Sequence, residues 1–420
     1  MPLERFSLEN FRCFKERQEV ELGSITVVLG RNNSGKSAVV RALQVLSTGI
    51  RTESPYPLDL ELVEGLSPTF TDLIHGSAPH GRIHVGMGFR DPEGRAFGID
   101  AEVQNIDDQG IQVVSLLNLH GSTETRRFAW EYSANDVVGD GRRYEFEGTS
   151  SVLKFQGLLP TASSWKDSIG GIDSISEKMR LEFDDIRYLG PFRKVPERFY
   201  RMPARRAASV GGRGEKALGM LAADALRGRG ELTREVNELL GRILPGWRIG
   251  IENIGAGMYV PRFYSTQDPE VSVHIDDVGT GVGQVLPILI QRAADRIHPP
   301  EGPVIEIVEE PELHLHPSAH AEVADLCVDA ARETRVRFLV ETHSETFLLR
   351  LRRRVAEGHL APKDLAVYFV EEGEGRATLR RISVTRSGNV DYWPKGVFSE
   401  DFEEARALAV AQAGLGDDAR

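Results

Sequence analysis

The alternation of apolar and polar positions predicts two strands and a helix at the start of the chain. In residues 3–9, Phe6 and Leu8 alternate with polar neighbours, as in a strand with one buried face. A second strand is predicted in "SITVVL" (residues 24–29), and a helix begins at about Ser37 and continues through "AVVRALQVL". A strand–turn–helix unit is therefore expected close to the N-terminus.

Residues 82–147 repeat apolar side chains with a period of two. The runs "RIHVGMGFR", "RRFAWEYS" and "RRYEFEG" each place an apolar or aromatic residue at every second position, and Gly- and Asp-rich turns separate them. This pattern is typical of strands joined by short connections. It predicts a peripheral antiparallel β-meander.

The pattern changes twice in the second half of the chain. Residues 173–245 are predicted to be mostly helical, interrupted by "YLGPFRKVP" (188–196) and "SVGGRGEK" (209–216), and no heptad repeat is sustained long enough for a long coiled coil. After Glu270, the short β-branched runs "PVIEIV" (303–308) and "RVRFLV" (335–340) are each followed by a polar turn and a helix. They predict buried parallel strands. Residues 403–420 are rich in alanine and predict a terminal helix.

Composition narrows the class of protein. The 420 residues carry a formal net charge of −12, so a nucleic-acid contact would need a local basic patch. The two cysteines, Cys13 and Cys327, provide neither a disulfide framework nor a CxxC metal site. The N-terminus lacks the apolar segment of a signal peptide, and the longest apolar run, "VLPILI", is too short to span a bilayer. We therefore expect no membrane association and a cytoplasmic location.

The first chemical motif is "GRNNSGKS", Gly30 to Ser37, which fits the phosphate-binding pattern G-x-x-x-x-G-K-[ST]. It follows a predicted strand and opens a helix, and this context argues against a coincidental glycine-rich turn. Backbone N–H groups at the helix N-terminus are expected to point at phosphates. Lys36 is expected to reach the β- and γ-phosphates, and the Ser37 hydroxyl to ligate Mg²⁺. The candidate nucleotide-binding residues are Gly30, Asn32, Asn33, Ser34, Gly35, Lys36, Ser37 and Ala38.

The second motif is "EEPELHLHP", residues 309–317, at the carboxyl end of the predicted strand "VIEIV". Ligands of open α/β sheets bind at the carboxyl ends of strands. Glu309 is therefore expected to bind Mg²⁺, directly or through water, and Glu310 to activate the attacking water. A buried carboxylate at Glu306, inside the apolar run, needs a partner that the pattern does not identify.

A zinc site is the alternative interpretation of the histidines in this region. His316 and His320 have the i, i+4 spacing of two ligands on one helix face, and His314 is nearby. They lack a cysteine or an acid at suitable spacing, and Pro317 places His316 at a helix entry. A structural or subunit-contacting turn is the favoured interpretation.

Two further segments complete the candidate site. In "RFLVETHSETFLL" a predicted strand ends at a polar turn that contains His343, which could contact the γ-phosphate or the attacking water. The alternative is an ordinary polar residue at a strand end. In "DDVGTGVGQVLPILI" three glycines precede an apolar helix, as in an anion-binding helix start or a plain glycine turn.

Taken in order, these motifs resemble the nucleotide-binding head of the ABC ATPase superfamily, in the branch with RecF-like, SMC-like and OLD-like proteins. "LENFRCF" and "GRNNSGKS" are similar to that branch's N-terminal turn and Walker A motif, "VEEPELHLHP" to its Walker B and D-loop, and "ETHSETFLLRLRRRV" to its histidine switch. "YLGPFRKVPERFY" and "GNVDYWPKGVF" resemble a bacterial stand-alone ATPase family with a short C-terminal segment of unassigned role.

The resemblance implies an α/β P-loop NTPase fold of the ABC-head type, with a mixed central sheet, an antiparallel β-subdomain and a helical insertion. Both ends of the chain would build one composite head. The expected organisation is an N-terminal ATPase lobe (1–160), a mainly helical insertion (161–250), a C-terminal ATPase lobe (251–385) and a tail (386–420). Its cofactors would be ATP and Mg²⁺.

The resemblance also implies that two heads enclose two ATP molecules. A signature loop formed by Gly279, Thr280, Gly281, Gly283 and Gln284 would face the γ-phosphate bound to the other protomer. Signature loops of the family usually carry a serine. This loop has Gly283 before Gln284 and only Thr280 as a hydroxyl, so its contacts stay open. Arg12 is expected to contact nucleotide, and Gln156 is a candidate Q-loop residue.

Two functions are compatible with the sequence. The first is an ATPase that forms a homodimer or a higher oligomer. It would switch DNA or a separately encoded effector, such as a nuclease, between two states. Its process would be DNA maintenance or defence against phage and plasmids. Lys36, Glu310 and His343 would be its catalytic residues. The second is an ATP-stabilised scaffold with little turnover. No Toprim nuclease is expected, because no D-x-D motif follows "VYFVEEGEGR".

Possible DNA contacts are local. Eight basic residues and one acid, Glu197, lie between Arg187 and Arg213, and "RLRRR" (350–354) follows the predicted switch turn. Such clusters could neutralise phosphates. A solvated or partner-facing surface is the alternative.

Overall fold

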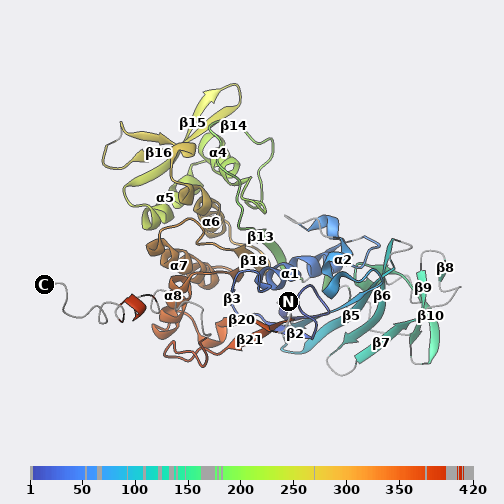
Figure 1. Ribbon diagram of the computed structural model, residues 1–420. Helices are drawn as coiled ribbons and strands as arrows, with labels where there is room; N and C mark the ends of the chain where they lie inside the picture. Colours follow the sequence, from blue (N-terminus) through green and yellow to red (C-terminus); the bar gives the residue numbers. More distant parts are fainter. Residues whose placement is uncertain are drawn as a thin grey trace.

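The computed structural model describes most of the chain, and Figure 1 shows its arrangement. The described residues are 3–393, except 53, 64–68, 92, 107–109, 122–124, 132–136, 139–140, 147, 162–175, 177–178, 181–182, 269 and 374–375, together with 404, 406–408 and 410. Tyr132 of the predicted meander and most of the predicted helix at 403–420 lie outside the described residues. None of the described helices is long and apolar enough to cross a membrane.

A six-stranded sheet forms the centre of the molecule (Figure 1). Its strands, in spatial order, are β13 (Asp185–Leu189), β18 (Val304–Glu309), β19 (Val336–Glu341), β3 (Ile25–Gly30), β20 (Leu365–Gly373) and β21 (Arg376–Ile382). The first five are parallel and β21 is antiparallel to β20. The predicted mixed sheet and the parallel strands at 303–308 and 335–340 are confirmed. An N-terminal strand, β3, lies between two strands from the C-terminal third.

Helices cover both faces of this sheet, so its strands are continuous runs of apolar residues. On one face, Ile25, Val27 and Leu29 of β3 pack in a core with the helices that include α6 (Thr280–Ile297), α7 (Pro317–Glu333) and α8 (Glu345–Ala356). On the other face, Val28 packs in the core that contains α1 (Lys36–Arg51). Pro317 is the first residue of α7 and His316 its N-cap, as predicted.

A second, antiparallel sheet packs against the far side of α1. Its strands are β1 (Leu3–Glu9), β2 (Gln18–Glu21), β4 (Arg82–Arg90), β5 (Ala96–Ile106), β6 (Ile111–His120), β7 (Thr125–Trp130), β8 (Val137–Val138), β9 (Gly141–Phe146) and β10 (Thr149–Leu153). The order β4–β5–β6–β7–β9 confirms the predicted meander. Val39, Val40 and Leu43 of α1 share one core with Val85 of β4 and Ile307 of β18. The helix that begins at the candidate phosphate loop is therefore buried between two sheets.

A smaller lobe lies beside α6 (Figure 1). It contains α4 (Ala217–Arg227), α5 (Glu231–Ile243), β14 (Tyr200–Arg201), β15 (Trp247–Gly255), β16 (Met258–Ser265) and β17 (Ser272–His274). The remaining elements are α2 (Phe70–Leu73), the hairpin β11 (Phe155–Gln156) and β12 (Leu159–Pro160), and the 3₁₀ helices η1 (Leu60–Leu62), η2 (His75–Ser77), η5 (Ile275–Asp277) and η6 (Pro362–Asp364).

The expectation of helix before the interruption at Tyr188 is wrong for residues 185–187, which begin strand β13 (Asp185–Leu189). This strand pairs with β18 in the central sheet. It does not read as a buried strand because it contains charged residues. Arg187 is accommodated there by an ion pair of 2.7 Å between its Nη1 and Asp295 Oδ1 on α6.

Candidate functional site

The carboxyl ends of β3, β18 and β19 meet at one edge of the central sheet. Glu309 at the end of β18 pairs in register with Glu341 at the end of β19, and Val28 of β3 pairs with Glu341 on the other side. The loop after β3 runs into α1. This topology therefore gathers three predicted motifs, although their residues are far apart in the sequence.

Two glycines shape the loop between β3 and α1. Gly30 has φ 156° and Gly35 has φ 107°, values that side chains disfavour. A Cβ at Gly35 would lie 2.3 Å from Cys13 Sγ, and one at Gly30 would lie 2.6 Å from Ser34 Oγ. The glycines of the motif are thus required by backbone geometry and by close approach.

The other loop residues divide into an exposed and a buried group. Asn32 and Asn33 are exposed, and Asn33 adopts φ 62°. Ser34 is buried, and its hydroxyl has no hydrogen-bond partner among the described residues. Ala38 lies inside the first turn of α1, where its N–H donates to the Gly35 carbonyl at 3.0 Å. Lys36 is also buried, and its Nζ donates to the Arg31 carbonyl at 2.7 Å.

Glu309 is held from three directions. Arg41 of α1 donates from Nε to Oε1 at 2.5 Å and from Nη2 to Oε2 at 2.6 Å, and the Tyr188 hydroxyl of β13 donates to Oε1 at 3.0 Å. Arg193 donates to the Glu309 carbonyl at 3.1 Å. Burial lowers the pKa of Arg193 to about 10. Both carboxylate oxygens of Glu309 thus have partners within the chain.

Glu341 has fewer partners than Glu309. The Ser37 hydroxyl donates to Glu341 Oε1 at 3.0 Å, and Lys36 Nζ lies 3.9 Å from the same oxygen. Its other oxygen, Oε2, is buried without a hydrogen-bond partner among the described residues. Burial, followed by the charge of Glu309, raises the pKa of Glu341 to about 7.

Glu310 and His343 face each other across the ends of β18 and β19. His343 Nε2 lies 3.9 Å from Glu310 Oε1, and Glu310 adopts φ 45°. The His343 N–H donates to Glu312 Oε1 at 2.7 Å, so the third acid of "EEPE" fixes the histidine turn. Burial and then Glu312 raise the pKa of Glu310, whereas burial and then Lys36 lower the pKa of His343.

The histidines of the zinc alternative have other partners. His316 Nδ1 lies 2.8 Å from Ser318 Oγ, and His320 Nδ1 lies 2.8 Å from Ser344 Oγ in the histidine turn. Among the described residues, the group of possible metal ligands is Glu310, Glu341 and His343, whose ligand atoms lie within 4.8 Å of one another. His316 and His320 therefore each contact a serine side chain.

The buried Glu306 has the partner that its sequence position required. Arg292 of α6 donates from Nη2 to Glu306 Oε2, and both side chains are almost fully buried. The Arg292 guanidinium also lies 4.9 Å from the centroid of the Phe338 ring. Burial raises the pKa of Glu306, while the Arg292 charge opposes this shift.

The predicted signature loop lies at the N-terminus of α6. Gly279 is its N-cap, and Gly279 and Thr280 are exposed. A Cβ at Gly281 would lie 2.3 Å from the His314 carbonyl oxygen, and one at Gly283 would lie 2.9 Å from Pro196 Cγ. Gln284, in contrast, is only 9% exposed. The glycines therefore let this loop pack closely against the turn that follows Glu310.

Arg12 and Gln156 occupy different surroundings. Arg12 adopts φ 51°, and burial followed by the nearby charge of Arg41 lowers its pKa. Gln156 Oε1 instead accepts from Arg180 Nη1 at 2.5 Å. Within the described part of the chain, Gln156 makes no hydrogen bond to Lys36 or to the strand ends.

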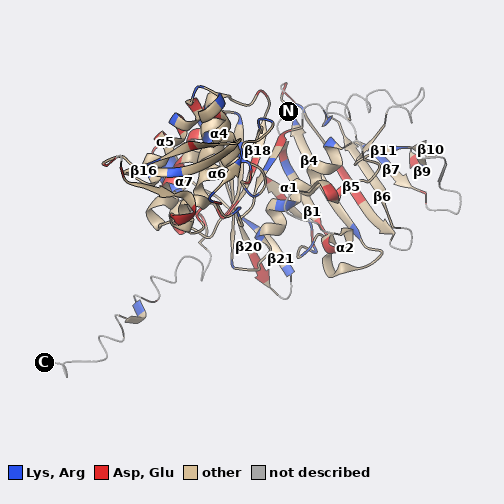
Figure 2. Ribbon diagram, turned by 90° about the horizontal axis from the view of Figure 1, so that it is seen from above, with Lys and Arg blue, Asp and Glu red and all other residues tan. Residues whose placement is uncertain are grey.

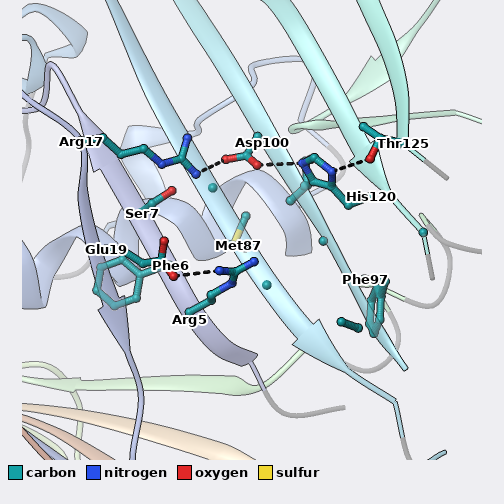
Figure 3. Close-up of a pocket in the computed structure, with 16 residues that line it drawn as sticks. Arg5, Phe6, Ser7, Arg17, Glu19, Met87, Phe97, Asp100, His120 and Thr125 are labelled. Carbon is teal, nitrogen blue, oxygen red and sulfur yellow. Dashed lines mark hydrogen bonds and ion pairs between the residues drawn. The ribbon is translucent and has the colours of Figure 1, made fainter. Parts of the chain in front are cut away.

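A separate hollow of about 330 Å³ lies on the antiparallel sheet (Figure 3). Gly86, Gly88 and Gly98 contribute to its lining. Its charged groups pair with one another: Arg5 with Glu19, and Arg17 with Asp100, which also contacts His120. It shares no lining residue with the strand-end site. We assign it no part in the chemistry.

The comparisons with known proteins agree with this geometry. Residues 25–350, well over half of the chain, match the family model described as "AAA domain, putative AbiEii toxin, Type IV TA system". The chain belongs to this AAA-domain family. A second family model, described as "Protein of unknown function", matches residues 360–408. No curated protein matches the chain. Membership of an ATPase family indicates ATP binding and hydrolysis, generally with Mg²⁺.

Solved SMC heads share the fold of this AAA-domain chain. One, an SMC head bound to the C-terminal winged-helix domain of ScpA, has 14% identity and a TM-score of 0.52, and the match covers 91% of this chain and 98% of that chain. Another, with an extended coiled coil and the C-terminal domain of ScpA from Pyrococcus furiosus, has 13% identity and a TM-score of 0.50, with coverage of 97% and 99%. The chain therefore has the fold of an SMC head domain.

The oxygen atoms at the strand ends fit Mg²⁺. This ion prefers carboxylate, hydroxyl and water oxygens to nitrogen or sulfur. Ser37 Oγ lies 3.0 Å from a Glu341 oxygen, and Glu310 and Glu341 place oxygens within 4.8 Å of each other. The AAA-domain chain thus offers a hydroxyl and carboxylates of the kind that a magnesium nucleotide requires.

Several residues of this site were not predicted from the sequence: Arg41, Tyr188, Arg193, Glu312 and Glu341. Only Glu341 had a positional signal, because it ends the apolar strand "RVRFLV" as Glu309 ends "PVIEIV". The others enter through contacts between distant segments.

Proposed function

We propose that this chain binds and hydrolyses ATP at the strand-end site and uses the ATP-bound state to dimerise and switch a partner. The observation that supports the proposal is the convergence of Lys36, Glu310 and His343 at the ends of three neighbouring strands. A phosphate loop alone would be compatible with nucleotide binding. A carboxylate and a histidine opposite it supply groups suited to hydrolysis.

Each residue has a role that follows from its position. Backbone N–H groups of the loop and the Lys36 ammonium would bind the phosphates. Ser37 and a neighbouring carboxylate at the strand ends would hold Mg²⁺, which neutralises charge on the β- and γ-phosphates. The hydrogen bond of 2.7 Å from Lys36 Nζ to the Arg31 carbonyl places the ammonium inside the loop.

Glu310 is proposed as the general base. Its raised pKa makes the carboxylate more basic than an exposed glutamate. The lowered pKa of His343 favours a neutral imidazole near pH 7, which can orient the water or contact the γ-phosphate. Glu312 would position His343 through the backbone hydrogen bond of 2.7 Å.

The proposed dimer uses the exposed N-terminus of α6. Gly279 and Thr280 are exposed there, and N–H groups of a first helical turn can bind the phosphate of an opposing protomer. The missing serine leaves Thr280 as the hydroxyl of this loop. Gly281 of this loop packs on the His314 carbonyl. Binding of a second protomer to the loop would therefore act directly on the turn that follows Glu310.

The partner is proposed to be a separately encoded effector protein, such as a nuclease that acts in DNA maintenance or defence. One similar SMC head is bound to a winged-helix domain, which supports binding of a protein partner to a head of this fold.

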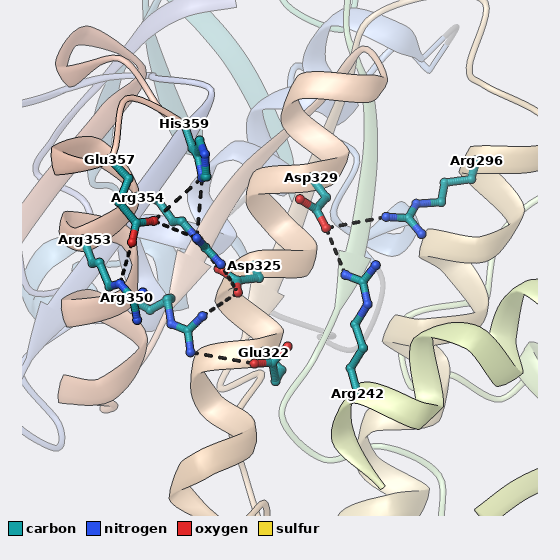
Figure 4. A network of polar contacts seen from close by, with 10 residues as sticks. All are labelled: Arg242, Arg296, Glu322, Asp325, Asp329, Arg350, Arg353, Arg354, Glu357 and His359. Carbon is teal, nitrogen blue, oxygen red and sulfur yellow. Dashed lines mark hydrogen bonds and ion pairs between the residues drawn. The ribbon is translucent and has the colours of Figure 1, made fainter. Parts of the chain in front are cut away.

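Much of the basic cluster "RLRRR" (residues 350–354) is neutralised by acids of the same chain (Figure 4). Arg350 and Arg354 both contact Asp325, and Arg353 contacts Glu357.

DNA contact is better supported at a different segment. Arg201, Arg205 and Arg206 are exposed and have no ion pair among the described residues, whereas Lys194 and Arg198 are paired with acids. Figure 2 shows basic and acidic segments interspersed over the lobe around α4 to α7. DNA is therefore proposed as a secondary ligand rather than as the defining one.

The test is phosphate release by the purified chain and by Glu310→Gln, with and without a separate effector or duplex DNA. The expected result is measurable hydrolysis in the wild type and a loss of ~10²-fold or more in the variant. The variant should retain Mg²⁺–ATP binding and become a dimer in its presence, as measured by light scattering. Lys36→Ala should lose both binding and dimerisation.

The scaffold alternative gives a different pattern. ATP would then produce the dimer in the wild type with no phosphate release under any condition, and Glu310→Gln would behave like the wild type. Absence of ATP binding in the folded wild type would contradict both functions.

A further inference from the structure

The two acids that end β18 and β19 differ in what compensates their charge. Glu309 and Glu341 are in register on adjacent strands, and their side chains are 2% and 4% exposed. A buried carboxylate is costly unless it is paired. Arg41 makes two hydrogen bonds to Glu309, whereas the nearest cation to Glu341, Lys36, lies 3.9 Å away and donates to a carbonyl instead.

The two carboxylate oxygens of Glu341 have different surroundings. Oε1 accepts from Ser37, the predicted metal-binding hydroxyl, at 3.0 Å. Oε2 is buried and has no hydrogen-bond partner among the described residues. The ligand atoms of Glu310 and His343 lie within 4.8 Å of that of Glu341. A compact, oxygen-preferring divalent cation would supply the missing positive charge at this position.

We propose that Glu341, together with Ser37, forms the protein's side of the Mg²⁺ site, and that Glu309 serves mainly to hold Arg41, Tyr188 and Arg193 in place. This inference rests on the proposed binding of ATP. It assigns the metal-side acid to the strand that precedes the histidine turn, and not to the first glutamate of "EEPE". Glu341 contacts the ion directly or through one bound water.

Glu309 is poorly placed for the metal for a specific reason. Its two oxygens accept three hydrogen bonds, from the Arg41 fork and from the Tyr188 hydroxyl. A metal ion at Glu309 would have to displace a bidentate guanidinium, which is among the strongest hydrogen-bond partners of a carboxylate. At Glu341 no such displacement is required.

The experiment measures metal binding rather than turnover. Mn²⁺ replaces Mg²⁺ as the probe, and its affinity for the ADP-loaded chain is measured by electron paramagnetic resonance for the wild type, Glu341→Gln, Glu309→Gln and Glu93→Gln. We expect Glu341→Gln to weaken Mn²⁺ binding at least tenfold. Glu309→Gln and the charge-matched control Glu93→Gln, at an exposed acid outside the site, should change it less than threefold. ADP affinity in EDTA should stay unchanged in Glu341→Gln.

A second variant keeps the test decisive if Glu341→Gln does not fold. Glu341→Asp retains the charge but shortens the side chain, and it should weaken Mn²⁺ binding while ADP still binds in EDTA. The inference is wrong if Glu309→Gln loses Mn²⁺ and both Glu341 variants retain it. If the folded wild type binds no nucleotide, with or without metal, the proposed function itself fails, and this outcome is distinct from the other.

Discussion

Arg41 of α1 holds both carboxylate oxygens of Glu309 at the end of β18, with donor–acceptor distances of 2.5 and 2.6 Å. The helix that begins at the phosphate loop is therefore tied to the strand that carries the paired glutamates. Because the Glu309 side chain is 2% exposed, loss of this partner would leave a buried carboxylate without a paired cation.

Removal of Arg41 alone should be strongly destabilising. Arg41→Met leaves a buried carboxylate with only the Tyr188 hydroxyl, and we expect a loss of ~3–5 kcal/mol in the free energy of unfolding. Arg41→Met combined with Glu309→Gln should lose less than Arg41→Met alone, because the uncompensated charge is gone. Urea unfolding of the two single variants and the double variant measures this coupling. Additive losses would show that the two residues do not interact.

Gly35→Ala should abolish tight nucleotide binding. The residue has φ 107°, and an added Cβ would lie 2.3 Å from Cys13 Sγ, so the loop must move. We expect a cost of ~1–3 kcal/mol from backbone strain and at least a tenfold loss of ATP affinity, measured by fluorescence titration. Cys13→Ala is the matched control and should bind ATP normally. The double variant Gly35→Ala/Cys13→Ala should recover only part of the ATP affinity, because it removes the clash with Cys13 Sγ but not the backbone strain at position 35.

Acid should weaken the antiparallel sheet through Glu102. Although burial raises its pKa, hydrogen bonds from His84 and Ser115 and the charge of Arg82 lower the pKa of Glu102 to about 2. A depressed pKa gives stability that is present above the unfolded value of 4.5 and is lost as pH falls toward 2. The hydrogen bond to Glu102 raises the pKa of His84, so this histidine stays charged in that window.

The measurement is urea unfolding of the wild type and Glu102→Gln from about pH 5.5 to about pH 2.5. The wild type should lose up to ~3 kcal/mol more than the variant across this range. Glu93→Gln, at an exposed acid, is the control and should follow the wild type. Parallel pH profiles for wild type and Glu102→Gln would contradict the assignment.

If the chain binds DNA, the salt-dependent part of its affinity for DNA should come from Arg201, Arg205 and Arg206. Changing all three to Gln should reduce the slope of log affinity against log salt concentration by about 3. Arg353→Gln removes a charge that Glu357 already pairs, and it should leave the slope unchanged. Fluorescence anisotropy with duplex DNA distinguishes these results. Equal slopes in the triple variant and the wild type would exclude this segment as the contact.

The sequence predicted the parts of the site that depend on local pattern. A glycine-rich loop after the strand ending at Gly30, two glutamates at the end of "VIEIV" and His343 after "RFLVE" are each visible in one short segment. Because the carboxyl ends of parallel strands share one edge, the motifs could be expected to meet before any contact was known. The structure brings them to the same edge.

Pairs between distant segments could not be predicted in the same way. Arg41 and Glu309 are separated by 268 residues, and nothing in the sequence around Arg41 distinguishes it from a surface arginine of a helix. The same is true of Arg292, the partner of Glu306. Strand β13 was missed because its Arg187 is satisfied by Asp295, a residue of another element. Charge within a strand is informative only when its partner is known.

The position of β3 also has a consequence for synthesis. It lies between β19 and β20, and 304 residues separate Ser37 from Glu341. On the ribosome, the phosphate loop emerges long before its acidic neighbours, and an early fragment has no β19 against which β3 can pair. Only a chain translated through β20 can assemble the central sheet. A product truncated before β19 would lack both the strand that pairs with one edge of β3 and the acid that accepts a hydrogen bond from Ser37.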